Sequence, residues 1–190
     1  HILTEARMAM NVEEAHAMLE ASLANPHLVA QVVPGPFTLK FDRTIQEIIA
    51  QGYLGNILAV QVNVSQGTFM DTDGPLHWRH DSDLSGFNTL ALGIWYETLL
   101  RWVGPATRVI AMAKVNMKQR RDDGGILRAI TVPDHVDIVC TMACGAQAHL
   151  SFSAVTGLAR PGEVWLYGTQ GTLRLDIGTD ALFGGSQDTP

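Results

Sequence analysis

The sequence has no long apolar run and no excess of positive charge, and it contains only two cysteines. No segment approaches the roughly 20 apolar residues that span a bilayer, and no basic region followed by an apolar signal segment is visible at the start. The formal net charge of −6 argues against nucleic acid, whose binding needs clustered Lys and Arg. We therefore expect a globular cytoplasmic protein with no membrane and no nucleic-acid partner.

The two cysteines, Cys140 and Cys144, fall in a segment that the residue pattern predicts as one strand. Four residues at about 3.3 Å each would separate them by roughly 13 Å, which is too far for a disulfide unless the chain turns between them. We expect both to be reduced and buried. Their spacing supplies no metal site, because further His or Cys ligands would have to converge from elsewhere.

Residues 1–36 have the pattern of one βαβ unit that ends in a break at Pro34-Gly35-Pro36. A short apolar strand over 2–5 precedes a helix over 11–24 and a continuous apolar run over 28–33. Asn11 is a candidate N-cap for the helix. The chain starts inside a strand and ends in a loop-like run, so we expect a fragment of a longer protein.

Residues 37–190 have the pattern of a sheet-rich second domain. Apolar periodicity predicts a helix from Phe41 to Gly52, and a second helix over 88–103 is apolar almost all round and therefore expected to be buried. A polar loop without secondary structure is expected over 66–85, and its length favours a functional role. Alternation predicts strands over 58–65, 109–117, 136–142, 146–153, 164–167 and 173–177. The expected fold class is α+β, an open, mostly antiparallel sheet with helices on one face, preceded by a remnant βαβ of a Rossmann-like domain.

Four segments, in their order and spacing, resemble the glucose–fructose oxidoreductase / inositol dehydrogenase / MocA family. They are Glu5-Ala6-Arg7 after the first strand, Thr44 to Ile57, Trp78-Arg79 with Ser85-Gly86, and the hairpin from Glu163 to Asp176. The resemblance implies that residues 1–36 end a truncated nucleotide-binding domain and that residues 37–190 form a substrate and oligomerisation domain. It implies the C-terminal region of an NAD(P)-dependent oxidoreductase acting on a sugar, polyol or related hydroxyl compound.

The resemblance also identifies positions at which this sequence departs from the family. Ala6, Ala91 and Trp95 stand where the family has its catalytic Lys, Asp and His, while Gly93 is kept. Removal of hydride from a carbinol carbon needs a base for the hydroxyl proton, and these three side chains cannot act as one. A Gly-x-Gly-x-x-Gly turn, which the family places upstream, does not occur here. We expect NAD or NADP in the full-length parent and none bound by this fragment; whether the chain is an enzyme stays open.

Four residues are candidates for cofactor binding. Glu5 ends a strand of a parallel pair, and the carboxyl ends of such strands face the ligand crevice; a solvated acid is the alternative. Arg7 could bind a phosphate or a carboxylate through its planar guanidinium, or lie on the surface. By resemblance, Trp78 and Arg79 would lie near the nicotinamide, the alternative being a solvated loop with Trp78 as a packing anchor.

Two residues are candidates for catalysis. Tyr96 is the side chain near the family's His position that could still move a proton, although its ordinary pKa near 10 would have to fall; core packing is the alternative. His77 lies in the polar loop beside His80 and several aspartates. That His/Asp cluster lacks a recognised ligand spacing, so no metal-binding residue is predicted.

The expected partners are a small-molecule substrate and a second copy of the chain. Trp165 and Tyr167 share one face of their strand, and aromatic residues favour interfaces. Members of the resembled family often pair subunits through this sheet, which implies a homodimer. The alternative function is a noncatalytic small-molecule-binding or dimerisation module derived from that family.

Overall fold

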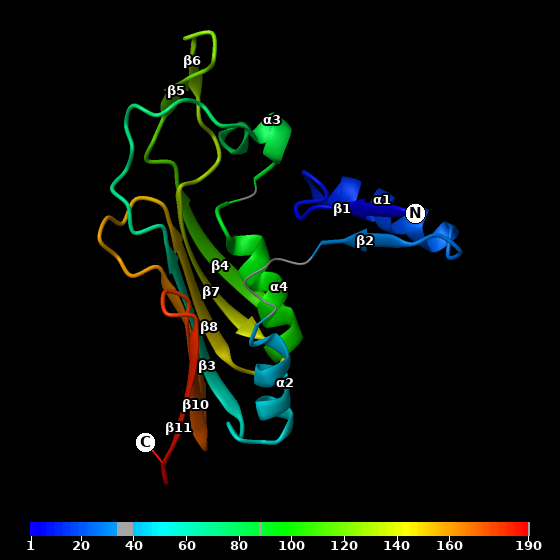
Figure 1. Ribbon diagram of the computed structural model, residues 1–190, viewed down its shortest axis with the longest axis vertical. Helices are drawn as coiled ribbons and strands as arrows, with labels where there is room; N and C mark the ends of the chain where they lie inside the picture. Colours follow the sequence, from blue (N-terminus) through cyan, green and yellow to red (C-terminus); the bar gives the residue numbers. More distant parts are fainter. Residues whose placement is uncertain (34–39, 88, 190) are drawn as a thin grey trace.

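The computed structural model describes residues 1–33, 40–87 and 89–189, and begins with the predicted βαβ unit. The strands β1 (Ile2–Thr4) and β2 (Ala30–Val32) pair in parallel around helix α1 (Val12–Ala24) (Figure 1). The side chain of Asn11 accepts a hydrogen bond from the Glu14 N–H at 2.9 Å, which confirms the predicted N-cap. The predicted break at Pro34-Gly35-Pro36 lies outside the described residues.

A seven-stranded sheet forms the body of the molecule, in the order β11-β10-β9-β3-β8-β7-β4 (Figure 1). Its strands are β3 (Ile57–Ser65), β4 (Ala106–Lys114), β7 (His135–Met142), β8 (Gln147–Ser153), β9 (Gly162–Gly168), β10 (Gly171–Asp176) and β11 (Ala181–Ser186). The β3–β8 pair is parallel and the other five pairs are antiparallel. The predicted class, α+β with a mostly antiparallel sheet, is confirmed. The strand β11 was not predicted.

Helices α2 (Asp42–Ala50) and α4 (Leu92–Val103) cover one face of this sheet (Figure 1). Alternate strand residues such as Val60, Val62 and Leu150 point towards these helices and are almost fully buried. Helix α4 buries Trp95, Leu99 and Trp102 against them, but Leu100 is 40% exposed. The prediction that this helix is buried is therefore wrong for one side, because α4 packs one face on the sheet and its opposite face, which carries Leu100, is exposed. Position 88, its predicted start, lies outside the described residues.

The segment predicted as an unstructured loop contains two short helical turns, the 3-10 helix η2 (Trp78–His80) and α3 (Ser82–Ser85). Local side-chain caps explain them: the His77 imidazole accepts the Arg79 N–H, and the Asp81 carboxylate accepts the Asp83 N–H. A small hairpin, β5 (Gln119–Arg121) and β6 (Leu127–Ala129), was also not predicted. In the part of the chain that the structure describes, no helix is long and apolar enough to cross a membrane.

Both cysteines are free thiols, as predicted, but only one is buried. Cys140 lies inside β7, where burial raises the pKa of its thiol. Cys144 is exposed, since it lies in the turn between β7 and β8 and not within a strand. The prediction of two buried cysteines is thus wrong for Cys144.

Candidate ligand cleft

A cleft of about 1330 Å³ lies where the βαβ unit meets the sheet domain. The loop after β1 forms one side of it, from Ala6 to Val12. The end of β3 with the loop from Gln66 to Asp71 forms another, and the first turn of α4 a third. Segments more than 80 residues apart in sequence therefore share one hollow, which is the usual setting of a small-molecule site.

Arg7 connects the βαβ unit to the sheet domain across this cleft. Its Nη2 donates a hydrogen bond to the Leu90 carbonyl at 2.7 Å. Its Nη1 is buried and has no hydrogen-bond partner among the described residues. Burial, followed by the positive charge of Arg79, lowers the pKa of Arg7 below its ordinary value, although a guanidinium stays charged. Ala6, joined to Arg7 by a cis peptide bond, also lines the cleft.

The first turn of α4 presents small and apolar groups to the cleft. Ala91, Gly93 and Ile94 line it. Ala91 is the N-cap residue and offers no side-chain cap, and the first turn holds no acidic residue. Trp95 turns the other way and is 2% exposed in the core. The helix therefore brings its positive N-terminal end to the cleft without a neutralising group.

The 3-10 turn contributes His77, Arg79 and His80 to the cleft lining. The His77 N–H donates to Nδ1 of His80 at 3.1 Å, and the Arg79 N–H donates to Nδ1 of His77 at 3.2 Å. Because each Nδ1 accepts a backbone proton, each neutral imidazole carries its own proton on Nε2. Trp78 is 45% exposed and does not line the cleft; the Arg79 guanidinium lies 4.2 Å above its ring.

Besides Trp78, two further predicted site residues lie apart from the cleft lining. Glu5 is exposed in the loop after β1. The Tyr96 hydroxyl accepts a hydrogen bond from the Ala106 N–H at 3.1 Å, at the start of β4, so its oxygen holds the edge strand. The structure thus brings Arg7, His77 and Arg79 together, and leaves Glu5, Trp78 and Tyr96 outside the cleft.

Sequence reasoning missed two charged residues of the cleft, Arg120 and Asp134. Arg120 donates hydrogen bonds to the carbonyls of Gly74 and Asp71, both at 2.7 Å. These bonds hold the loop that contains Asp71 and Gly74 against Arg120. Asp134 accepts the N–H groups of Asn116 and Met117. No spacing in the sequence marks either residue, because each reaches the cleft through tertiary contacts alone.

The family model for the GFO/IDH/MocA C-terminal domain matches residues 43–174. The chain belongs to this family. Its match covers α2, the cleft loop, α4 and the sheet as far as β10, so the predicted resemblance is confirmed.

The relatives of this chain include a curated D-xylose 1-dehydrogenase [NADP(+)] from Haloarcula marismortui, which is 27% identical over 168 residues. That match covers 84% of this chain and 46% of the relative, so the chain spans about half the length of the curated relative. A levoglucosan dehydrogenase solved with NADH and levoglucosan aligns with a TM-score of 0.84 and 21% identity, covering 100% of this chain and 51% of that one. The transcriptional regulator Gal80p of Kluyveromyces lactis aligns with a TM-score of 0.81 and 17% identity, covering 98% and 48%. At these identities the two structures establish the fold.

Proposed function

We propose that this chain is the C-terminal region of an NAD(P)-dependent oxidoreductase that acts on a hydroxyl group of a sugar, polyol or related compound. The observation that carries the proposal is the cleft between the loop after β1 and the first turn of α4, lined from both sides by Ala6 and Gly93. These are positions that the family resemblance places beside cofactor and substrate. Residues 1–36 are then the last βαβ unit of the nucleotide-binding domain, and 37–190 the substrate domain.

The relatives support the reaction class. One is described as an NADP(+)-dependent xylose dehydrogenase, and a structural neighbour holds NADH with levoglucosan. NAD or NADP would accept the hydride in the whole protein, while the fragment alone binds none. Arg7 and Arg79 line the cleft, where a charged group of cofactor or substrate can reach them. Contact of Glu5 and Trp78 with the cofactor, and a cytoplasmic location, stay predictions.

A noncatalytic binding module is the second candidate. One feature of the cleft favours it, namely the shortage of side chains that can accept a proton. Ala6 and Ala91 cannot take a proton, and His77 and His80 already use Nδ1 as acceptors. To serve as a base, His77 would have to release the Arg79 N–H first. Tyr96 stays a prediction as a proton carrier, with its hydroxyl at β4. A regulator of similar fold, Gal80p, is among the structural neighbours.

A titration of the natural polypeptide that contains this sequence distinguishes the candidates. We expect NAD⁺ or NADP⁺ to bind in isothermal titration, and absorbance of the reduced cofactor to rise with an aldose or polyol. Cofactor binding without turnover on a broad sugar panel identifies the noncatalytic module. Binding of neither dinucleotide contradicts the oxidoreductase proposal.

We also propose a homodimer that forms through the uncovered face of the sheet. One row of paired residues crosses this face from β4 to β11: Ile110, Val139, His149, Gln61, Trp165, Arg174 and Phe183. The rings of Trp165 and Tyr167 stack there at 5.5 Å, which supports the predicted aromatic patch. A second copy would cover the apolar members of the row by two-fold symmetry.

A further inference from the structure

The starting point is a buried guanidinium nitrogen that lacks a partner. Nη1 of Arg7 is inaccessible to solvent and makes no hydrogen bond within the described residues, while Nη2 is fixed on the Leu90 carbonyl. A buried charged donor is expected to be paired, since its desolvation is otherwise uncompensated. The hydrogen bond of Nη2 holds the guanidinium group in place, and Arg7 is one of the residues that line the cleft.

Other positive groups surround the same hollow. Arg79 lines it, and no described acidic residue lies within ion-pair distance of Arg79 or of Arg7. The charge of Arg79 is near enough to lower the pKa of Arg7. Because Nδ1 of His77 and Nδ1 of His80 each accept a backbone N–H, Nε2 is the donor nitrogen of each ring. The N-terminus of α4, which has no side-chain cap, adds its positive dipole end.

The acidic residues of the cleft are engaged elsewhere. Asp134 accepts the N–H groups of Asn116 and Met117 and the Asn116 amide. Glu97 pairs with Arg101 at 3.0 Å. Asp71 accepts the N–H groups of Asp73 and Gly74 and lies 3.8 Å from Arg120. These acids are paired with Arg101, Arg120 and backbone N–H groups, and none of them pairs with Arg7 or Arg79.

We propose that Arg7 and Arg79 bind an anionic group of the substrate, so that the cleft takes a sugar-derived acid or sugar phosphate. The proposal rests on the proposed function, whose substrate class it narrows. A guanidinium suits both groups, because its fork of N–H donors matches the oxygens of a carboxylate or a phosphate. Arg7 is fixed to Leu90, two residues before α4, on the substrate-domain side of the cleft. That attachment favours a substrate group over a phosphate of the dinucleotide.

The experiment measures binding to the chain itself, in the absence of cofactor. D-Glucuronate and D-glucose form a matched pair that differs only at the sixth carbon, and glucose 6-phosphate tests the phosphate form. Inorganic phosphate and NADP⁺ serve as the two remaining probes. We expect at least one anionic sugar to bind about tenfold or more tightly than D-glucose, and its affinity to fall as salt rises.

Variants locate the anion within the chain. Arg7→Gln should weaken the anionic sugar roughly ten- to hundredfold, as expected for the loss of a charge-assisted hydrogen bond, and leave D-glucose unchanged. Arg7→Lys should restore part of the affinity, and Arg79→Gln, an exposed position, should weaken binding without affecting folding. Arg43→Gln is the matched control for lost charge and should bind as the original chain does. Circular dichroism melting checks that each variant is folded.

Three results would overturn the proposal. The first is equal affinity for D-glucose and for both anionic sugars. The second is unchanged binding of the anionic sugar in folded Arg7→Gln and Arg79→Gln. The third is binding of NADP⁺ to this chain, against the expectation above, together with a loss in the two variants that is confined to NADP⁺; this result would assign the two arginines to a cofactor phosphate. Because sugar binding is measured without dinucleotide, failure of the cofactor titration in the natural polypeptide contradicts the oxidoreductase proposal alone.

Discussion

At the scale of single residues, the hydrogen bonds already made by the side-chain nitrogen atoms of the cleft decide which of these atoms can still bind a ligand. His77 and His80 form a chain of caps, in which the His77 N–H donates to His80 and the Arg79 N–H donates to His77. These bonds need both Nδ1 atoms without a proton. Protonation of His80 at Nδ1 therefore competes with the hydrogen bond that its ring accepts from the His77 N–H.

The stability of the protein should therefore depend on the charge of His80. Burial, then the electrostatic effects of Arg120 and of the His77 side chain, hold the pKa of His80 below 6.5, against a smaller opposite effect of Asp134. The unfolded chain thus binds the proton more strongly, so this contribution to stability is complete above about pH 6.5 and is lost as the pH falls through the folded-state pKa. Urea unfolding at a series of pH values should show stability falling below about pH 6.5.

The matched variant for this prediction is His80→Gln, whose side-chain oxygen can still accept the His77 N–H. It should flatten the slope of stability against pH in that window, whereas His16→Gln, exposed on α1, should leave the slope as it is. The carboxylates whose pKa is lowered from 3.8, such as Asp71 and Asp137, titrate below this window and do not interfere. An unchanged slope in His80→Gln would show that another group carries the pH dependence.

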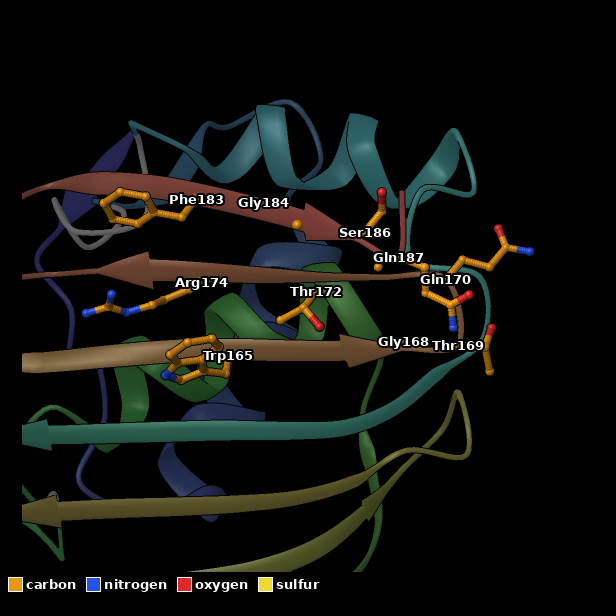
Figure 2. A pocket seen from close by; sticks show the side chains of 12 residues that line it. Trp165, Gly168, Thr169, Gln170, Thr172, Arg174, Phe183, Gly184, Ser186 and Gln187 are labelled. Atoms are coloured by element: carbon orange, nitrogen blue, oxygen red, sulfur yellow. The ribbon is translucent and has the colours of Figure 1, made fainter. Parts of the chain in front are cut away.

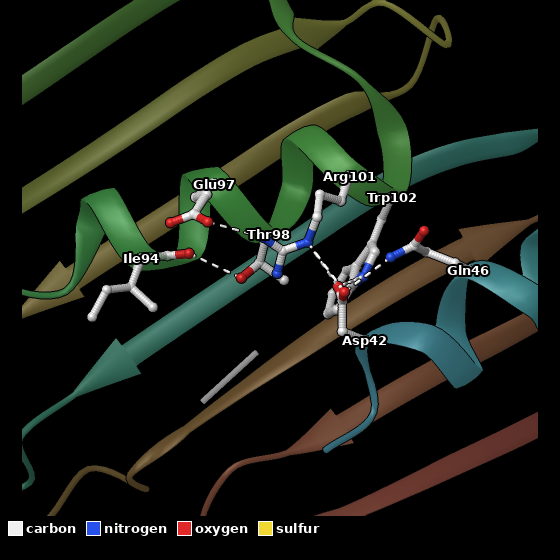
Figure 3. Close-up of polar contacts among 7 residues, drawn as sticks. All are labelled: Asp42, Gln46, Ile94, Glu97, Thr98, Arg101 and Trp102. Atoms are coloured by element: carbon white, nitrogen blue, oxygen red, sulfur yellow. Dashed lines mark hydrogen bonds and ion pairs between the residues drawn. The ribbon is translucent and has the colours of Figure 1, made fainter. Parts of the chain in front are cut away.

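At the scale of elements, one carboxylate joins the two helices that cover the sheet. Asp42, in the first turn of α2, accepts hydrogen bonds from Trp102 Nε1 at 2.9 Å and from Arg101 Nε at 3.1 Å, both on α4 (Figure 3). Its other oxygen accepts from the Gln46 amide at 2.9 Å. Trp102 is 6% exposed, so its indole N–H depends on this acceptor.

Asp42→Ala should lower the free energy of unfolding by about 1–3 kcal/mol, the range for a buried donor left without its partner. Chemical denaturation followed by tryptophan fluorescence measures the change. Asp123→Ala, in the exposed turn between β5 and β6, removes the same charge and should change stability by less than about 0.5 kcal/mol. Equal losses in the two variants would mean that Asp42 acts through net charge and not through the contact with α4.

The elements differ in how far the sequence could predict them. Strands such as β3 and β8 were predictable because burial of one face imposes alternation, as at Val60 and Val62. The strand β11 escaped prediction because Gly184 and Gly185 carry no alternation, and its pairing with β10 supplies its order. The η2 turn escaped because its caps are imidazoles, which ordinary capping rules leave out.

The cleft shows the same division. Arg7, His77 and Arg79 were predictable because family motifs contain or flank them, and the structure brings them to one hollow. The orphaned nitrogen of Arg7 and the contribution of Arg120 follow from contacts across more than 40 residues, which no local pattern encodes. The position of Tyr96 likewise depends on the start of β4, where its hydroxyl accepts the Ala106 N–H.

At the scale of the whole molecule, the sheet has one covered and one uncovered face. On the uncovered face, Arg174 lies between the rings of Trp165 and Phe183, at 5.3 and 5.5 Å, and pairs with Glu163 and Asp176. This arrangement forms one wall of a shallow hollow of about 540 Å³ over β9, β10 and β11 (Figure 2). At the other edge of the sheet, the apolar side chains of Ile110 and Met112 on β4 are exposed to solvent. An antiparallel sheet with one wet face is usually polar there, so these apolar groups favour a covering partner.

The proposed homodimer predicts that charge on this face separates the copies. Ile110 and Met112 of β4 are 78% and 80% exposed and share the uncovered face, so Ile110→Glu and Met112→Glu should leave the monomer folded. In the dimer each would bury an unpaired carboxylate, which raises the dissociation constant by about tenfold or more. Light scattering with size-exclusion chromatography should give the mass of two chains for the original protein and of one chain for the double variant. Leu158→Glu, 84% exposed in the loop between β8 and β9, should stay dimeric; a monomeric original chain at all concentrations would contradict the proposal.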